Sequence, residues 1–290
     1  MDNMKNTEKL LKGKYVADKI SERLIEDIKI LHNNDIIPKL AIVRVGNRAD
    51  DLAYERGIIK RCEKVDVEVK VIQLQENVTQ EKYINTIKGL NEDKLVDGIL
   101  CFRPLPSHLN EQEIKYIINP QKDIDSFNPI NTAKTIEGDE TAFVSCTPLA
   151  VIEMLRYYEI PLEGSNIVVV GRSMVVGKPV SMLLLNENAT VTVCHSKTKN
   201  LKEITSQADI LVAAVGKAKM ITKEYIKEDA VVIDVGINVD EDGNLCGDVD
   251  TEDILDKVAK ITPVPLGVGS ITNTILVEQL IKACKLQHGL

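Results

Sequence analysis

The stretch that most constrains the fold of this 290-residue chain is residues 166–179, Asn-Ile-Val-Val-Val-Gly-Arg-Ser-Met-Val-Val-Gly-Lys-Pro. A β-branched run, Ile167–Val170, ends at Gly171, and a loop with two glycines leads through Pro179 into a helix. This order of buried strand, glycine turn and helix N-terminus builds a phosphate site, because N–H groups at a helix start carry partial positive charge. Ser173 stands where the GxGxxG pattern places its second glycine, so the loop is a variant of that pattern.

Predicted strands and helices alternate along the chain, which indicates an α/β fold with parallel sheets covered by helices. Strands are expected at 40–45, 67–74, 98–102, 167–170, 190–194, 210–215, 231–235 and 261–264. Helices are expected at 16–31, 50–64, from about 79, 149–158 and 272–286. Before the helix at 149–158, Thr147 is the predicted N-cap and Pro148 the predicted first helical residue.

A loop-rich crossing marks the expected domain boundary. The pattern of strands breaks at Arg103-Pro-Leu-Pro, and Asn119-Pro, Asn128-Pro and Gly138 follow. We therefore expect an N-terminal α/β domain at 1–140 and a Rossmann-like dinucleotide-binding domain at 141–271, with the last helix, 272–286, packing back on the first domain.

Composition excludes several classes of protein. A formal net charge of −8 without a basic stripe argues against a nucleic-acid partner. No apolar run approaches the roughly 18–20 residues of a membrane span, and residues 1–14 lack an apolar export signal, so we expect a cytoplasmic protein. Six cysteines lack CxxC spacing and four histidines lie far apart, so we expect reduced core cysteines and no metal site.

The end of the second strand of the dinucleotide domain indicates which cofactor fits. In such domains an acid about 20 residues past the glycines binds the ribose of NAD, whereas basic residues admit the 2′-phosphate of NADP. Here the strand ends Val193-Cys-His-Ser-Lys-Thr198, without an acid. Arg172, Ser196 and Lys197 are candidates to contact that phosphate, although ordinary solvated loop residues would give the same pattern. The missing acid favours NADP.

Several motifs, in order from about residue 10 to 285, resemble the methylenetetrahydrofolate dehydrogenase/cyclohydrolase family. They are Val45-Gly-Asn-Arg, Tyr54, Asp97-Gly-Ile-Leu, Pro104-Leu-Pro, Lys122-Asp-Ile-Asp, Cys146-Thr-Pro, Gly171-Arg-Ser-x-x-Val-Gly-Lys-Pro, His195-Ser-Lys-Thr, Ala214-Val-Gly-Lys, Val232-Ile-Asp-Val-Gly-Ile-Asn, Gly247-Asp-Val and Ile261-Thr-Pro-Val-Pro-x-Gly-Val-Gly. The resemblance implies a homodimer of two-domain subunits with folate held between the domains. It also implies oxidation of 5,10-methylenetetrahydrofolate by NADP, followed by hydrolysis of the methenyl product.

The resemblance also implies roles for individual residues. Tyr54 and Asp125 would be catalytic and substrate-binding, and Pro265, Gly267 and Gly269 would bind substrate. The cofactor would be bound by Gly171, Arg172, Ser173, Gly177, Ser196, Lys197, Gly216, Gly236 and Ile237.

Four departures from the family pattern fall in the folate half of this expected site. The lysine of the family's Tyr-x-x-x-Lys motif is Ile58, and the glutamine that partners it is Phe102. The hydroxyl residue three before the tyrosine is Asp51, and the family's Pro-Gly-Gly-Val-Gly-Pro loop reads Pro265-Leu-Gly-Val-Gly-Ser270.

These departures predict that hydrolysis is reduced or lost, since it needs water activation and proton transfer, and isoleucine supplies neither. Arg61 shares a helical face with Ile58, but a guanidinium stays protonated and cannot act as a base. Hydride transfer depends mainly on positioning and is expected to persist.

Two other functions are compatible with the same residues. The chain would act as a regulatory or scaffolding dinucleotide-binding protein if the folate site were inactive, a reading favoured by Ile58, Phe102 and Leu266. Alternatively, it would be a dehydrogenase for another substrate, whose carboxylate would meet Arg44 and Arg103 at strand ends.

Overall fold

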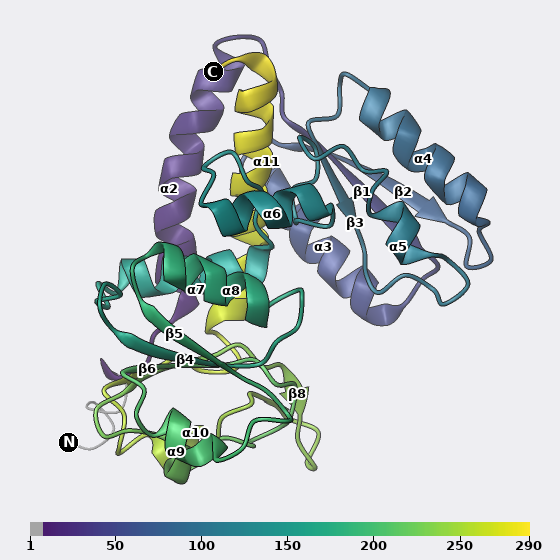
Figure 1. Cartoon of the computed structure of the whole chain (residues 1–290). Coiled ribbons are helices and arrows are strands. Elements are labelled where there is room, and N and C mark those ends of the chain that lie inside the picture. Colours follow the sequence, from purple (N-terminus) through teal and green to yellow (C-terminus); the bar gives the residue numbers. More distant parts are fainter. Residues whose placement is uncertain (1–7) are drawn as a thin grey trace. The chain divides into compact units, whose positions relative to one another are not determined.

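The computed structural model of the chain describes residues 8–290, which form two compact units (Figure 1). The three-stranded unit comprises Lys19–Ser145 and Asn273–Leu290, and the five-stranded unit comprises residues up to Asp18 together with Cys146–Thr272. The sequence-based division at 140 and 141 lies close to the change of unit after Ser145, whereas residues 8–18 group with the five-stranded unit. Among the described residues, no helix combines the length and apolarity that crossing a membrane requires.

The three-stranded unit is built on a parallel sheet with the strand order β2-β1-β3. The strands are β1 (Lys39–Val45), β2 (Glu68–Leu74) and β3 (Gly98–Cys101). The central strand β1 pairs on both sides and is buried along most of its length, as its apolar sequence predicts. The chain passes from β1 through α3 (Ala49–Glu63) to β2, then through α4 (Gln80–Glu92) to β3 on the other side of β1. The strand order thus reverses at β1, and ligands bind parallel sheets outside the carboxyl ends of the strands at such a point.

Local sequence signals explain the helices of this unit. The Thr79 hydroxyl accepts a hydrogen bond from the Lys82 N–H and caps α4. Asn128 caps α6 (Pro129–Glu137), whose first residue is proline, and α6 ends at Gly138 with φ +72°. A short helix, α5 (Glu111–Ile114), lies between them in sequence.

The last helix, α11 (Thr272–His288), belongs to the three-stranded unit and lies beside α2 (Gly13–His32) (Figure 1). Lys285 of α11 pairs with Asp27 of α2 at 2.9 Å. A Cβ atom at Gly98 would lie 2.6 Å from Leu280 Cδ1, so the glycine that opens β3 permits close packing of α11.

The five-stranded unit contains a wholly parallel sheet in the order β10-β7-β6-β4-β5. Its strands are β4 (Asn166–Val170), β5 (Thr190–Cys194), β6 (Ile210–Ala213), β7 (Val231–Asp234) and β10 (Lys260–Ile261). Its other elements are α7 (Cys146–Tyr157), α8 (Gly177–Asn186), α9 (Leu201–Thr205), α10 (Thr251–Ile254), the 3₁₀ helices η1 (Lys223–Tyr225) and η2 (Val268–Ser270), and a hairpin of β8 (Asn238–Val239) with β9 (Leu245–Cys246). The strand order reverses at β4, as in a Rossmann-like fold.

Several sequence-based boundaries were wrong, and three of them have a physical explanation. Helix α7 begins at Cys146, so Thr147 lies inside the helix and is not its N-cap. Pro148 then falls within the first turn, where its missing N–H has no intrahelical acceptor to lose. Strand β6 ends at Ala213 rather than 215, because the Val215 N–H donates to the Asp248 carboxylate. Strand β10 ends at Ile261 rather than 264. Pro263 has no N–H group to donate to a neighbouring strand, so the strand cannot continue through it.

Candidate functional site

A pocket of about 260 Å³ lies at the carboxyl ends of β4, β5 and β6, where the strand order of the five-stranded sheet reverses. Four of the predicted cofactor residues line it, namely Gly171, Arg172, Ser173 and Ser196. The other lining residues are Val170, His195, Leu201, Ala214, Val215, Lys217 and Met220. The described lining contains two cations, Arg172 and Lys217, and no carboxylate, so the pocket suits an anionic ligand.

Two glycines let the loop after β4 fold tightly. Gly171 has φ +139°, and a Cβ there would lie 2.2 Å from the Ala214 carbonyl oxygen. A Cβ at Gly177 would lie 2.2 Å from the Gly171 carbonyl oxygen. Both positions therefore exclude a side chain.

Ser173 binds N–H groups at the start of α8, the helix that follows this loop and whose N-cap position is Val176. Its hydroxyl accepts hydrogen bonds from the Val176 N–H at 3.1 Å and the Gly177 N–H at 3.4 Å. Its carbonyl oxygen accepts a bond from the Lys178 N–H at 3.0 Å. The sequence pattern predicted outward-pointing N–H groups here, but these three are bonded within the loop, two of them to the hydroxyl of the serine that replaces the second glycine. Anion binding would therefore rest more on Arg172 than on this helix start.

The loop after β5 is folded by its own side chains. The Thr198 hydroxyl accepts a bond from the His195 N–H, and His195 Nδ1 accepts one from the Lys197 N–H. Ser196 faces the pocket with Arg172, whereas Lys197 is exposed outside the described lining.

Two buried carboxylates hold the neighbouring strand ends together, and sequence reasoning had assigned them no role. Asp248 accepts bonds from the N–H groups of Val215, Gly216 and Lys217 at 2.6–3.1 Å. Asp234 accepts bonds from the N–H groups of Gly236, Asp248 and Val249 at 2.9–3.0 Å. Burial raises the pKa of Asp234 to about 6 despite these bonds.

The three remaining predicted cofactor residues of this edge lie outside the described lining of the pocket. Gly216 has φ +67°, a conformation that glycine adopts without strain. A Cβ at Gly236 would lie 2.3 Å from the Asp248 carboxyl carbon, so that glycine makes room for the carboxylate. Ile237 is 67% exposed.

The loop after β10 also carries predicted substrate-binding residues, Pro265, Gly267 and Gly269. Leu266, at the position where the family pattern has glycine, has φ +82° and is 66% exposed. This conformation is costly for a residue with a Cβ. A Cβ at Gly267 would lie 2.4 Å from the Pro263 carbonyl oxygen, so this loop excludes a side chain there.

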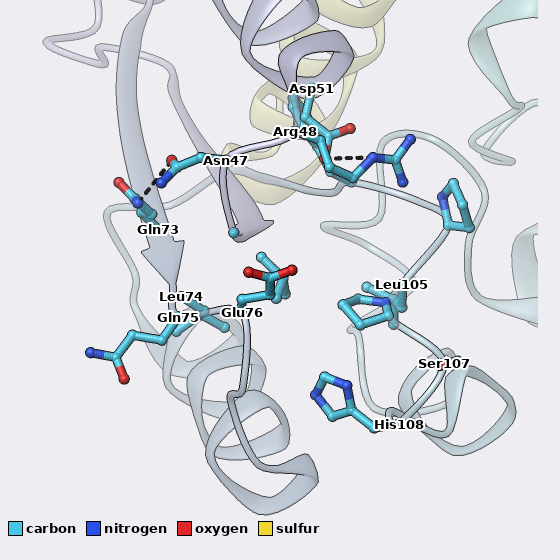
Figure 2. Close-up of a pocket in the computed structure, with 15 residues that line it drawn as sticks. Asn47, Arg48, Asp51, Gln73, Leu74, Gln75, Glu76, Leu105, Ser107 and His108 are labelled. Atoms are coloured by element: carbon cyan, nitrogen blue, oxygen red, sulfur yellow. Dashed lines mark hydrogen bonds and ion pairs between the residues drawn. The ribbon is translucent and has the colours of Figure 1, made fainter.

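A larger pocket, of about 820 Å³, lies at the carboxyl ends of β1, β2 and β3 in the three-stranded unit. Figure 2 shows Arg48 and Asp51 from the start of α3, Glu76 after β2, and Ser107 and His108 after β3 around it. The remaining lining residues are Val45, Gly46, Asn47, Gln73, Leu74, Gln75, Phe102, Pro104, Leu105 and Pro106. Two of the four departures from the family pattern, Asp51 and Phe102, thus face this pocket.

The family's tyrosine–lysine–glutamine positions are occupied here by a phenol and two apolar side chains. Tyr54 is 37% exposed, and its ring centroid lies 5.3 Å from that of Phe102. Ile58, one turn further along α3, is fully buried. Arg61 is engaged elsewhere, since its guanidinium donates a hydrogen bond to the Ser21 hydroxyl of α2.

The predicted pterin-binding carboxylate already has a partner. Arg103 pairs with Asp125 at 3.3 Å and stacks over the ring of Phe127 at 4.8 Å. Both members of the pair remain about a quarter exposed. A substrate that binds here would therefore meet a carboxylate and a guanidinium side by side.

Arg44 is a buried structural residue rather than a free charge at a strand end. It pairs with Glu55 of α3 at 2.9 Å and donates to Asn47 Oδ1 at 2.9 Å. Arg44 is therefore not available to bind the carboxylate of a different substrate, as the alternative hypothesis of another dehydrogenase required.

These features define a class of protein: a two-unit α/β chain with a Rossmann-like dinucleotide site in one unit and a second pocket at a strand-order reversal in the other. Residues 11–125 match the catalytic-domain model of tetrahydrofolate dehydrogenase/cyclohydrolase, and residues 145–288 match the NAD(P)-binding-domain model of the same family. The chain belongs to the tetrahydrofolate dehydrogenase/cyclohydrolase family.

Relatives agree with this assignment. The bifunctional protein FolD of Clostridioides difficile (strain 630) is 61% identical over 280 residues, which are 97% of this chain and 98% of that protein. The crystal structure of the bifunctional FolD methylenetetrahydrofolate dehydrogenase/cyclohydrolase of Campylobacter jejuni superposes with a TM-score of 0.93 at 42% identity, covering 96% of this chain and 98% of that one. The Trypanosoma brucei enzyme, solved with NADP cofactor and inhibitor, gives 0.91 at 33% identity, covering 97% and 98%.

Proposed function

We propose that this chain is an NADP-dependent 5,10-methylenetetrahydrofolate dehydrogenase whose methenyltetrahydrofolate cyclohydrolase activity is strongly reduced or lost. The observation that carries the proposal is Ile58, a fully buried apolar side chain one turn after Tyr54, at the position of the family's lysine. Tyr54 and Asp125 are the proposed catalytic and substrate-binding residues, and Pro265, Gly267 and Gly269 are proposed to contact substrate.

The proposed loss of hydrolysis follows from proton transfer. Hydrolysis of the methenyl carbon requires a group that activates water, which contributes roughly 10²–10⁴-fold to the rate. Ile58 and Phe102 carry no proton that could be transferred, and Phe102 packs against Tyr54 where the family pattern has a polar amide. The Arg61 guanidinium faces Ser21 and cannot act as a base.

Hydride transfer makes smaller demands on these side chains. NADP, when bound, supplies the acceptor for the hydride that leaves the methylene carbon. The protein's part is to hold that carbon in place and to exclude water. Tyr54 offers a partly exposed ring for stacking, and Asp125, held by Arg103, offers a carboxylate for the ring N–H groups of the pterin.

The pocket of the five-stranded unit supports the choice of NADP. Arg172 and Ser196 line it together, and the described lining contains no carboxylate that would repel a 2′-phosphate. The Trypanosoma brucei relative was solved with NADP. Lys197, Gly177, Gly216, Gly236 and Ile237 complete the proposed cofactor site together with Gly171 and Ser173.

We also infer, from the family resemblance and the composition, that the chain acts as a homodimer in the cytoplasm. Light scattering during size exclusion measures the molar mass directly, and a monomer at micromolar concentration would contradict the dimer.

A non-catalytic dinucleotide-binding homologue is the second candidate. Ile58 and Phe102 favour it, because two buried apolar side chains stand where the family pattern has a lysine and a glutamine. Purified protein is mixed with 5,10-methylenetetrahydrofolate and either NADP or NAD, while reduced cofactor and methenyl product are followed separately. Turnover with NADP and accumulating methenyl product supports the dehydrogenase. NADP binding without turnover supports the non-catalytic protein instead.

A further inference from the structure

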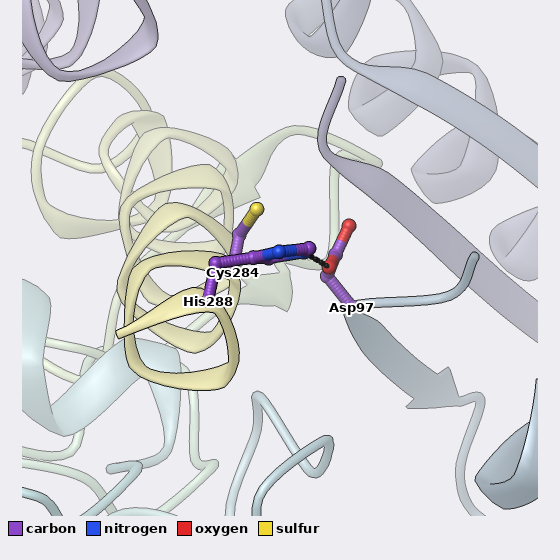
Figure 3. Close-up of side chains that lie close together, drawn as sticks. All are labelled: Asp97, Cys284 and His288. Carbon is purple, nitrogen blue, oxygen red and sulfur yellow. Dashed lines mark ion pairs between the residues drawn. The ribbon is translucent and has the colours of Figure 1, made fainter. Parts of the chain in front are cut away.

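Three potential metal ligands converge in the three-stranded unit, away from its pocket. Cys284 and His288 lie one turn apart on one face of α11, and Asp97 immediately precedes β3 (Figure 3). The thiol sulfur, an imidazole nitrogen and a carboxylate oxygen all lie within 4.8 Å of one another. We propose that these three side chains bind one zinc-type divalent cation, which fastens the last turn of α11 to the sheet.

The geometry is close to that of a zinc site. With bonds of about 2.0–2.3 Å, tetrahedral ligand atoms lie roughly 3.3–3.8 Å apart. His288 Nε2 already lies 3.5 Å from Asp97 Oδ1. The sulfur has to approach by no more than about 1 Å, which rotation of side chains can supply. A set of one sulfur, one nitrogen and one oxygen suits Zn²⁺ and leaves the fourth position to water.

The surroundings hold Asp97 in a suitable orientation. Its Oδ2 accepts a hydrogen bond from the Lys39 N–H at 2.8 Å, which leaves Oδ1 directed at His288. The carbonyl oxygen of Asp97 accepts a further bond from Gln287 Nε2 at 2.7 Å. Hydrogen bonds of this kind fix the orientation of metal ligands. Asp97 and Cys284 are buried and His288 is exposed, so an ion could enter from the His288 side.

Charge and proton balance fit one ion. Without a metal, burial and the neighbouring Asp97 carboxylate raise the pKa of the Cys284 thiol to about 12, so that thiol is protonated at neutral pH. Binding would release this proton to solvent and form a zinc–thiolate bond. The two charges of the cation would then be balanced by one thiolate and one carboxylate.

The position points to a structural role. Asp97 and Lys39 stand at the amino ends of β3 and β1, whereas the 820 Å³ pocket lies at the carboxyl ends of the same strands. Seven residues of β1 span roughly 20 Å. The ion would therefore stabilise the fold without taking part in folate chemistry. The sequence-based expectation of no metal site rested on the absence of CxxC spacing and on the distances between histidines, and it did not consider a thiol one turn before a histidine.

Cobalt substitution tests the site on the untagged full-length chain after treatment with chelator. We expect one Co²⁺ per chain, with near-ultraviolet charge-transfer absorption from a thiolate, and displacement of Co²⁺ by Zn²⁺. Cys284→Ser should abolish this absorption. Cys62→Ser is the matched control, since it removes another buried thiol of the same unit and should leave the absorption unchanged.

His288→Gln keeps the test independent of folding, because His288 is an exposed residue at the end of α11. This variant should fold normally, bind Zn²⁺ at least about tenfold more weakly, and lose the increase in Tm that Zn²⁺ gives the parent chain. The proposal is overturned if the parent chain shows no thiolate–cobalt absorption. It is equally overturned if the absorption survives Cys284→Ser, or if Zn²⁺ raises the Tm of both proteins equally.

Discussion

The ring of Phe102 packs against the ring of Tyr54, with 5.3 Å between centroids and 36° between ring planes. Phe102 is buried, and it stands where the family pattern places the glutamine that partners a lysine. That lysine position is Ile58, which is also buried. A lone buried amide would lack its partner and cost free energy, so the two apolar replacements are consistent with each other. Tyr54 therefore packs against an apolar ring and has no lysine or glutamine beside it to take part in proton transfer.

Arg103 is expected to position Asp125 for the substrate. The pair is about a quarter exposed, so its loss should cost on the order of 1 kcal/mol of substrate binding. Arg103→Leu should therefore raise the KM for methylenetetrahydrofolate about fivefold and leave kcat within about twofold. Steady-state kinetics provide the measurement. Arg156→Leu, which breaks an ion pair outside both pockets, is the control. A tenfold fall in kcat at constant KM would contradict a positioning role.

Arg172 should determine the preference for NADP. A charged hydrogen bond to phosphate is worth about 1.5–3 kcal/mol, so Arg172→Gln should lower kcat/KM for NADP by about 10–100-fold and leave the value for NAD nearly unchanged. Lys178→Gln removes an exposed cation from α8 and serves as the matched control. Equal losses with the two cofactors would exclude a contact between Arg172 and the 2′-phosphate.

Leu266 should be strained by its backbone conformation. At φ +82° any Cβ is unfavourable, and the side chain is mostly exposed, so little packing is lost when it is removed. Leu266→Gly should be more stable than Leu266→Ala by about 1 kcal/mol, the reverse of the order found in helices. Urea unfolding of the two variants measures this difference. Greater stability of the alanine variant would refute the strain.

Asp234 should make stability depend on pH. Its pKa of about 6 in the folded chain exceeds the ordinary value of 3.8, so the folded chain binds a proton more tightly than the unfolded chain. The stabilisation from this proton is complete below pH 3.8 and disappears as pH rises through 6. Asp234→Asn removes this titration. Its destabilisation in urea unfolding should therefore be about 1 kcal/mol larger at pH 5 than at pH 7.5. Equal destabilisation at the two pH values would contradict the raised pKa.

Local sequence signals were sufficient to predict the main elements of the fold. The apolar run before Gly171 predicted β4, and the Thr79 signal predicted the start of α4, because caps, turns and periodicity act over a few residues. Helix α6 was not predicted, because Asn128-Pro was interpreted as part of a loop rather than as a helix start. The pocket at the end of β4 contains Arg172 and Ser196, which were chosen from the same local pattern.

Contacts between distant segments were beyond prediction from local signals. The bonds of Asp248 to residues 215–217 join segments more than 30 residues apart, and they shorten β6. Arg44 is buried because it pairs with Glu55 of α3. The polar sequence around Glu55 did not predict that this side chain would be buried in an ion pair. Asp97 meets Cys284 and His288 only because α11 packs beside the start of β3.

Restoring the lost pair should recover hydrolysis. Ile58→Lys alone would bury an unpartnered ammonium, whereas Ile58→Lys with Phe102→Gln gives the lysine an amide partner. The double variant should convert methenyltetrahydrofolate faster than the parent chain by at least about tenfold. Ile59→Lys with Phe102→Gln, which places the lysine one residue away on another face of α3, is the control and should show no gain.

The most direct test of the central claim is the hydrolysis of 5,10-methenyltetrahydrofolate by the unmodified chain, measured beside the bifunctional enzyme of Campylobacter jejuni at equal concentration. Without the lysine and glutamine, we expect a rate at least about 10²-fold below that of the relative and close to the uncatalysed rate. A rate within about tenfold of the relative would contradict the claim that Ile58 and Phe102 have removed the acid–base chemistry.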